Sequence, residues 1–177
     1  MIHLIGPGGA GKTTSGMALA NQLKTRFADL DAEFISRNGD ISAFIAMHGY
    51  EAYAKRNVDC YLALLDAQKS PDVIALSSGF MIYKEEIHPE YAVLRECIAF
   101  SRFSFVLLPT LDFETCVAEI VRRQLQRPFA RTPEREESVI RSRFSIYANF
   151  PARKVRTQGP VATVVEEIIF QLRNTHE

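Results

Sequence analysis

The chain has 177 residues, enough for the core of one domain of ordinary size. Hydrophobic residues make up 47% and charged residues 24%, as in globular proteins, and 21 basic residues balance 21 acidic ones. This charge balance, with no basic stripe interleaved with aromatic residues, argues against a nucleic-acid partner. The three cysteines, Cys60, Cys97 and Cys116, are far apart and fit neither a disulfide framework nor a metal site.

No apolar run approaches the ~18 residues of a membrane span, and no basic segment precedes the first apolar residues. We therefore expect a cytoplasmic protein without a membrane partner. No repeat or linker interrupts the chain, so residues 1–177 are expected to form a single domain, with a monomer as the expected oligomeric state. His3, in the first apolar run, is expected to be a structural residue.

Helical and strand-like patterns alternate along the chain. Strands are predicted over 2–5, 27–30, 73–76, 103–108 and 154–157. Helices are predicted over 13–26, 33–47, 50–69, 112–126, 134–149 and 161–173, and another begins near Pro89. This alternation predicts an α/β fold with a parallel sheet of about five strands and helices on both faces. The loops after Ile5, Leu30 and Leu76 should then meet in one cleft, because ligands bind at the carboxyl ends of such strands.

The first loop, residues 6–14, reads Gly-Pro-Gly-Gly-Ala-Gly-Lys-Thr-Thr and matches the P-loop pattern G-x-x-x-x-G-K-[ST]. Its glycines let successive backbone N–H groups converge on one anion, and the helix that follows adds the positive end of its dipole. Lys12 can reach the β- and γ-phosphates of a nucleotide, and the Thr13 hydroxyl is suited to hold Mg²⁺. The predicted nucleotide contacts are Gly8, Gly9, Ala10, Gly11, Lys12, Thr13 and Thr14.

Two acids, Asp29 and Asp31, flank Leu30 at the end of the second predicted strand. A spacing of two residues places both carboxylates on one side of an extended chain. One acid can then hold Mg²⁺ while the other accepts a proton from a substrate hydroxyl. The alternative is a pair of solvated acids before a helix, with Asp31 as its N-cap.

Basic residues gather between Arg122 and Arg143, around a loop bracketed by prolines. Phosphoryl transfer needs cations on the γ-phosphate and exclusion of water, so a mobile arginine-bearing lid over residues 122–135 is predicted, with Arg127 as its leading candidate. Arg141 is expected to be solvated. The alternative is a helical face with salt bridges, because glutamates are interspersed among the arginines.

Together these residues resemble the shikimate kinases, small P-loop kinases that phosphorylate a ring hydroxyl with ATP and Mg²⁺. Residues 6–14 are similar to the family's GPxGxGK[ST]T opening, and 27–31 to its F-x-D-x-D segment. Arg127-Pro128 looks like the Arg-Pro that opens the family lid. Arg143, four residues before Tyr147, resembles the arginine of the R-x-P-L-Y segment.

The resemblance implies a three-layer P-loop NTPase fold and an ATP- and Mg²⁺-dependent kinase of a small-molecule acceptor. It implies that Lys12 and Arg127 contact the ATP phosphates and that Asp29 lies on the magnesium side with Thr13. Asp31 would hold and polarise the acceptor hydroxyl. Arg143 would bind the acceptor carboxylate, and Gly79 would belong to the substrate floor.

Three positions depart from the family pattern. The glycine triplet after the third strand is Ser77-Ser78-Gly79, the arginine of G-E-x-x-F-R is Ala54, and Ser145 replaces the proline of R-x-P-L-Y. Lys55 or Arg56 could substitute for the missing guanidinium only from another angle of the helix. The acceptor could therefore be shikimate, another polyol or hydroxy acid such as a sugar acid, or a nucleotide. A nucleotide-binding regulatory module without turnover is the alternative of another class, and Arg156 is a candidate base contact.

Overall fold

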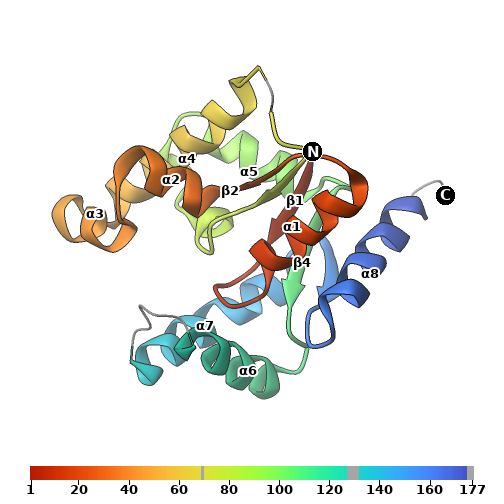
Figure 1. The fold of residues 1–177 in the computed structure, drawn as a ribbon. Helices are drawn as coiled ribbons and strands as arrows, with labels where there is room; N and C mark the ends of the chain where they lie inside the picture. Colours follow the sequence, from red (N-terminus) through yellow and green to blue (C-terminus); the bar gives the residue numbers. More distant parts are fainter. Residues whose placement is uncertain (69, 127–131, 175–177) are drawn as a thin grey trace.

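The computed structural model describes residues 1–68, 70–126 and 132–174 (Figure 1). In these residues the strands are β1 (Ile2–Ile5), β2 (Phe27–Asp29), β3 (Val73–Ala75), β4 (Ser104–Leu108) and β5 (Arg153–Arg156). They form one sheet in the order β2-β3-β1-β4-β5, and every neighbouring pair is parallel. The predicted parallel sheet of about five strands is confirmed.

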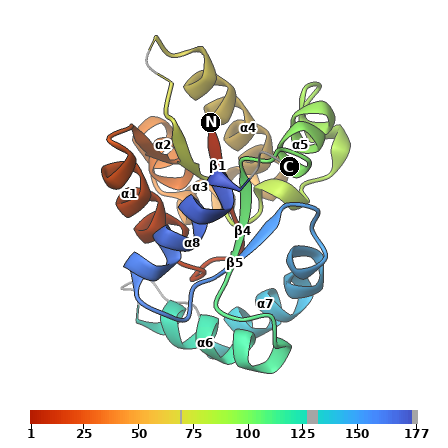
Figure 2. The same ribbon diagram turned by 90° about the vertical axis from the view of Figure 1, so that its right-hand side faces the viewer.

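Helices connect these strands and cover both faces of the sheet. They are α1 (Lys12–Leu23), α2 (Leu30–Asn38), α3 (Ile41–His48), α4 (Tyr50–Asp66), α5 (Tyr91–Ala99), α6 (Phe113–Leu125), α7 (Pro133–Ala148) and α8 (Val161–Arg173), with short 3₁₀ turns η1 (Phe80–Ile82) and η2 (Glu85–Ile87). Figure 2 shows α1 and α8 side by side on one face of the sheet, to the left of β4 and β5. None of the described helices is both long and apolar enough to cross a membrane.

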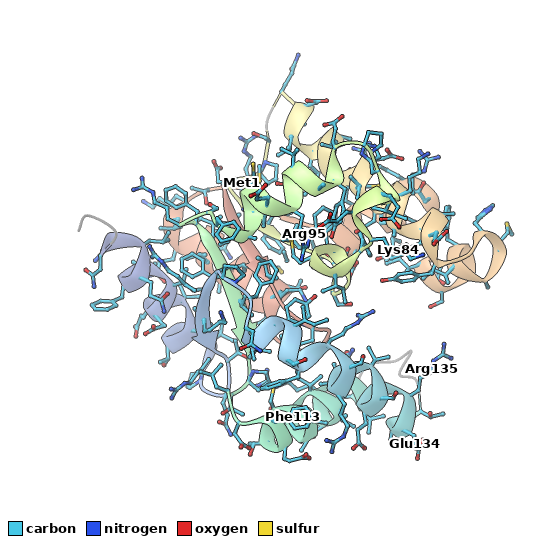
Figure 3. All side chains as sticks on the ribbon, turned by 180° about the vertical axis from the view of Figure 1, so that it is seen from behind. Met1, Lys84, Arg95, Phe113, Glu134 and Arg135 are labelled. Atoms are coloured by element: carbon cyan, nitrogen blue, oxygen red, sulfur yellow. The ribbon has the colours of Figure 1, made fainter. Side chains whose placement is uncertain are left out.

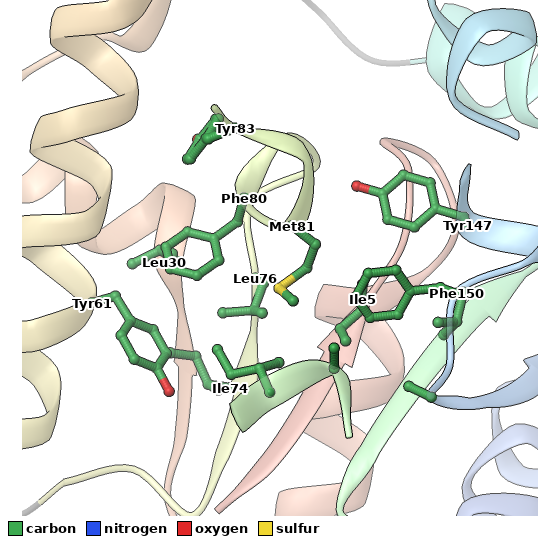
Figure 4. Packing of buried hydrophobic residues seen from close by; sticks show 14 of the residues in the cluster. Ile5, Leu30, Tyr61, Ile74, Leu76, Phe80, Met81, Tyr83, Tyr147 and Phe150 are labelled. Atoms are coloured by element: carbon green, nitrogen blue, oxygen red, sulfur yellow. The ribbon is translucent and has the colours of Figure 1, made fainter. Parts of the chain in front are cut away.

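The core has two parts because successive side chains of a strand point to opposite faces. In β1, Leu4 packs in the cluster under α1 and α8, whereas Ile5 packs in the larger cluster under α4, α5 and α7. Figure 4 shows this larger cluster from close by, with Tyr83 and Tyr147 on either side of the segment that carries Met81. Burying these apolar surfaces on both faces holds the carboxyl ends of the strands in fixed positions.

His3 is a core residue, in agreement with the structural role expected for it. It is 8% exposed, and its Nε2 atom lies 2.8 Å from the hydroxyl of Tyr61. Burial, with a smaller effect of the N-terminal ammonium, lowers the pKa of His3 from 6.5 to about 4. The ring is therefore neutral near pH 7.

One predicted helix, over 33–47, is two helices in the structure. Gly39 ends α2 with a φ of 82°, and the Asp40 carboxylate then accepts a hydrogen bond of 2.8 Å from the Ala43 N–H to begin α3. A glycine at a helix end followed by an N-capping acid is a strong stop-and-start signal. It overrides the apolar spacing that favours one continuous helix.

Candidate active site

The P-loop joins β1 to α1 through a backbone that approaches its neighbours closely. Gly6 has a φ of 143°, and a Cβ atom there would lie 2.4 Å from the carbonyl oxygen of Leu107 on β4. Lys12 is the first residue of α1, and its Nζ donates to the carbonyl oxygens of Gly6 and Pro7 at 2.7 and 2.9 Å. The ammonium group of Lys12 is therefore held over the loop.

Asp29 links the second strand to the P-loop. Its Oδ1 atom accepts hydrogen bonds from the N–H groups of Asp31 and Ala32 at 2.9 and 3.2 Å and so caps α2. Its Oδ2 atom accepts a hydrogen bond of 2.5 Å from the Thr13 hydroxyl. Both oxygens of the carboxylate are thereby oriented by the fold.

The expected extended geometry around Asp31 is wrong. The strand ends at Asp29, Leu30 begins α2, and Asp31 lies in the first helical turn. The capping residue is Asp29, so the alternative that gave this role to Asp31 is also wrong. The reason is that the Asp29 carboxylate satisfies N–H groups that a helix start leaves without backbone partners.

A cavity of about 140 Å³ lies at the carboxyl edge of the sheet, where three loops meet. The residues that line it are Gly8, Gly9, Gly11, Lys12, Thr13, Thr14, Asp29, Asp31, Leu76, Ser78 and Gln124. The predicted meeting of the loops after the first three strands is confirmed. The sequence did not predict Gln124 as a cavity residue. Its side chain reaches the P-loop from α6, since a Cβ atom on Gly8 would lie 2.5 Å from the Gln124 amide nitrogen.

The oxygen atoms of Thr13 and Asp29 suit a small hard cation. Mg²⁺ prefers oxygen ligands and takes only one or two from the protein when it also binds substrate phosphates. Groups of three or more His, Cys, Asp or Glu that could hold a metal are absent from the described residues. The hydroxyl and carboxylate pair therefore fits Mg²⁺ bound together with a nucleotide.

The segment after β3 is covered from two sides. From α7, the Tyr147 hydroxyl and Arg143 Nη1 donate to the Ser78 carbonyl at 2.5 and 3.5 Å. From the start of α4, Tyr50 extends over Gly79, because a Cβ atom on Gly79 would lie 2.5 Å from the Tyr50 hydroxyl. Arg143 and Gly79 thus lie at the same floor, whereas neither lines the cavity of about 140 Å³.

Ala54 stands where the family pattern has an arginine. Its position leaves no open pocket, and no cation of α4 takes the place of the missing guanidinium. Ala54 is 1% exposed and packs in the larger core cluster. Lys55 and Arg56 are exposed, and Arg56 pairs with Asp59 at 3.5 Å. The side of α4 that faces the floor presents tyrosines instead.

A second cavity, of about 300 Å³, adjoins the P-loop on the side of β5. Its lining residues are Gly9, Gly11, Thr14, Ser15, Arg123, Thr157, Gly159, Val161 and Val164. Arg156, the candidate base contact, is exposed and does not line this cavity. Thr157 could have been found from its position as the final residue of the last predicted strand, because ligands bind at strand ends.

Two arginines of the basic segment between Arg122 and Arg143 have different outcomes. Arg127 lies outside the described residues, as do residues 128–131 of the segment 122–135. Arg141 pairs with Glu114 and Glu137 at 2.7 and 2.8 Å, which fits the salt-bridge alternative at this position. In Figure 3, Arg135 at the start of α7 and Lys84 lie on different parts of the molecule.

Residues 8–173 match the sequence model of the shikimate kinases. The chain belongs to the shikimate kinase family. A shikimate kinase of Nitratidesulfovibrio vulgaris is 32% identical over 94% of this chain and 92% of that protein. One of Aliivibrio fischeri is 31% identical over 97% of this chain and 94% of that protein.

The fold of the family is also found among solved structures. A shikimate kinase from Acinetobacter baumannii in complex with shikimate superposes with a TM-score of 0.73, covers 99% of this chain and 94% of its own, and is 23% identical. Family membership and the sheet order together make this chain an ATP-dependent kinase of a small molecule.

Proposed function

We propose that this kinase transfers the γ-phosphoryl group of ATP, bound with Mg²⁺, to a hydroxyl of a polyhydroxylated carboxylate, with shikimate as the first acceptor to test. The observation that carries the proposal is the meeting of Lys12, Thr13, Asp29 and Asp31 around one cavity. A loop that only binds nucleotide has no need of a second carboxylate beside the γ-phosphate.

The nucleotide would occupy the two adjoining cavities. The loop N–H groups and Lys12 would hold the β- and γ-phosphates, after Lys12 exchanges its bonds to Gly6 and Pro7 for phosphate oxygens. Thr13 and Asp29 would hold Mg²⁺, which supplies positive charge to the phosphates during transfer. The nucleoside would lie in the cavity of about 300 Å³, against Arg123 and Gly159.

Asp31 would act as the general base. The acceptor hydroxyl gives its proton to the Asp31 carboxylate as the acceptor oxygen bonds to the γ-phosphorus. The bond from that phosphorus to the bridging oxygen breaks, and ADP leaves with its electron pair. Arg143 would orient the acceptor carboxylate by a charge-assisted hydrogen bond, and Arg127 is proposed to contact the phosphates from the lid.

The test is acceptor-dependent release of ADP in a coupled assay with ATP, Mg²⁺ and shikimate. Asp31→Asn should lower kcat by about 10²–10⁴-fold with little change in ATP affinity, since general acid–base catalysis contributes that much. Asp40→Asn is the matched control, because Asp40 caps α3 and an amide oxygen can keep that cap.

Two results would contradict the proposal. Wild-type protein that binds ATP but releases no ADP with any hydroxylated acceptor would favour the regulatory module instead. Wild-type-like turnover by Asp31→Asn would remove Asp31 from the role of base.

A further inference from the structure

We propose that the acceptor subsite binds a polyhydroxylated compound with one anionic group, held by the Tyr50 hydroxyl on the α4 side and by Arg143 on the α7 side, the one guanidinium that the described residues place at this floor. This inference rests on the proposed function and specifies how its acceptor is selected. It follows from what surrounds the Ser77-Ser78-Gly79 floor in the described part of the chain.

Tyr50 is the residue on the α4 side that is open to a ligand. It is 45% exposed, yet its hydroxyl end lies directly over Gly79. Its ring is packed at 5.8 Å from that of Tyr53 and 6.0 Å from that of Tyr83, measured between centroids. The hydroxyl is thus held at the floor by an aromatic cluster, while nearly half of the residue remains accessible.

Behind Tyr50 the wall is polar but uncharged. The Tyr83 hydroxyl donates to the Asn57 side-chain oxygen at 3.1 Å, and Asn57 is completely buried. The Asn57 amide nitrogen has no hydrogen-bond partner among the described residues. Buried polar groups are normally satisfied, so the Asn57 amide nitrogen is suited to a bound water behind the tyrosines.

The buried phenols of Tyr53 and Tyr83 remain protonated at the pH of the reaction. Burial raises the pKa of Tyr53 above its usual range, and the nearby Asp31 carboxylate raises it further. Burial likewise raises the pKa of Tyr83, with further contributions from Tyr53, Tyr50 and Asp31. Because Asp31 acts on both phenols, the tyrosine wall lies within electrostatic reach of the proposed base.

Positive charge enters this floor from α7. Arg143 is half-buried and donates to the Ser78 carbonyl, whereas the neighbouring cation Lys84 is exposed and paired with Glu51 at 2.8 Å. A second anionic group turned toward α4 would meet neutral phenols and the charge of Asp31. Such a group would lose its hydration without gaining a counter-charge.

The consequence is that hydroxyl pattern contributes to selection alongside charge. One charge-assisted hydrogen bond favours an anionic ligand over its neutral analogue by about 10–150-fold, and two such bonds would multiply that factor. A phenolic hydrogen bond of an accessible tyrosine contributes about fivefold to tenfold, equally for the acid and for its ester.

The experiment compares kcat/KM for shikimate and for its methyl ester in wild type, Tyr50→Phe and Arg143→Gln. Wild type should prefer the acid by no more than about 150-fold. Tyr50→Phe should lower kcat/KM for both compounds by about fivefold to tenfold through KM, and Arg143→Gln should affect the acid alone. Tyr61→Phe is the matched control. It removes a tyrosine hydroxyl from the same helix, α4, but that hydroxyl bonds to His3 and not to the floor.

Gly79→Ala tests the role of the Tyr50 hydroxyl by a second substitution. Its Cβ atom would displace the Tyr50 hydroxyl, and it would also lie 3.1 Å from Cε1 of the buried Tyr83 ring, a contact that Tyr50→Phe leaves in place. It should therefore raise KM in wild type and raise it less, but still measurably, in a Tyr50→Phe background. Such non-additivity identifies residues that act together.

A wild-type preference for the acid of 10³-fold or more, or an unchanged KM in Tyr50→Phe, would overturn the inference. If wild type shows no turnover, the proposed function fails, and calorimetric titration with shikimate then decides the inference separately. Binding that Tyr50→Phe weakens supports it, and absence of binding overturns it.

Discussion

The two oxygens of the Asp29 carboxylate have different partners. One oxygen caps α2, and the other receives the hydroxyl of Thr13, the residue proposed to share Mg²⁺. The cap fixes the carboxylate's orientation through two backbone N–H groups, so the second oxygen is aimed at the phosphate site without a further supporting side chain. Stability and proposed metal binding are therefore coupled at a single residue, and suitable substitutions should separate them.

Asp29→Asn should keep the fold and lose the metal. An amide oxygen still caps the helix, so the melting temperature should stay near that of wild type. The loss of a charged oxygen ligand should raise the Mg²⁺ concentration for half-maximal activity by tenfold or more. A Mg²⁺ titration of initial rates with matched thermal melts measures both quantities.

Asp29→Ala adds the loss of the cap, which costs about 0.5–2 kcal/mol and about 1–8 °C in melting temperature for a chain of this size. Asp40→Ala is the control, since it removes a cap from α3 far from the proposed metal ligands. An unchanged Mg²⁺ requirement in Asp29→Asn would show that Asp29 is not a ligand.

At the residue scale, the sequence predicts what local chemistry determines. Lys12 and Thr13 lie in a short pattern whose backbone geometry follows from the pattern itself. Tyr50 was not predicted, because its position over Gly79 depends on how α4 packs against the segment after β3. Asp31 was selected correctly as a cavity residue but with the wrong backbone, since the capping competition between two nearby acids is not decided by spacing alone.

At the scale of elements, Gly39 separates two helices and orients α3 against α4. Its φ of 82° and ψ of −166° belong to a region that only glycine adopts readily. The local signal for this break, glycine followed by an N-capping aspartate, was present in the sequence. The apolar spacing of 33–47 continues across the break and by itself favours a single helix.

Gly39→Ala should destabilise the fold by about 1–3 kcal/mol through backbone strain alone. No atom lies within 4 Å of a Cβ atom placed there, so no clash contributes. Gly159→Ala is the matched control, because its Cβ atom also meets open space and its φ is not positive. That variant should be neutral or stabilising by about 0.4–1 kcal/mol.

Urea denaturation of the two alanine variants gives the comparison directly. Equal changes in the free energy of unfolding would mean that alanine adopts the positive-φ backbone of residue 39 without strain. Another boundary that differs is the start of α2 at Leu30, where the Asp29 cap begins the helix three residues before the predicted start at residue 33.

At the scale of the whole molecule, Arg123 connects three segments that are distant in sequence. From α6 its guanidinium donates to the Gly9 carbonyl of the P-loop at 3.3 Å and to the Thr157 carbonyl after β5 at 2.7 Å. It also pairs with Glu119 at 2.6 Å. Its partners lie as far as 114 residues away, so no local pattern could reveal this connection.

Arg123→Met should therefore weaken the fold and the nucleotide site together. Loss of these charge-assisted hydrogen bonds should cost about 1.5–3 kcal/mol, or about 3–12 °C in melting temperature. The freed P-loop should also bind ATP more weakly, so the rise in melting temperature on adding ATP and Mg²⁺ should shrink.

Arg122→Met is the matched control for this prediction. Arg122 is the adjacent residue and pairs with the same Glu119 at 2.8 Å, but its side chain is 59% exposed, against 22% for Arg123. Exposed ion pairs contribute little, so both the melting temperature and its shift with ATP should stay near those of wild type. Equal losses of melting temperature in the two variants would mean that the effect comes from the net charge of α6. If the melting temperature of Arg123→Met rises with ATP as much as that of wild type, Arg123 contributes to stability and not to nucleotide binding.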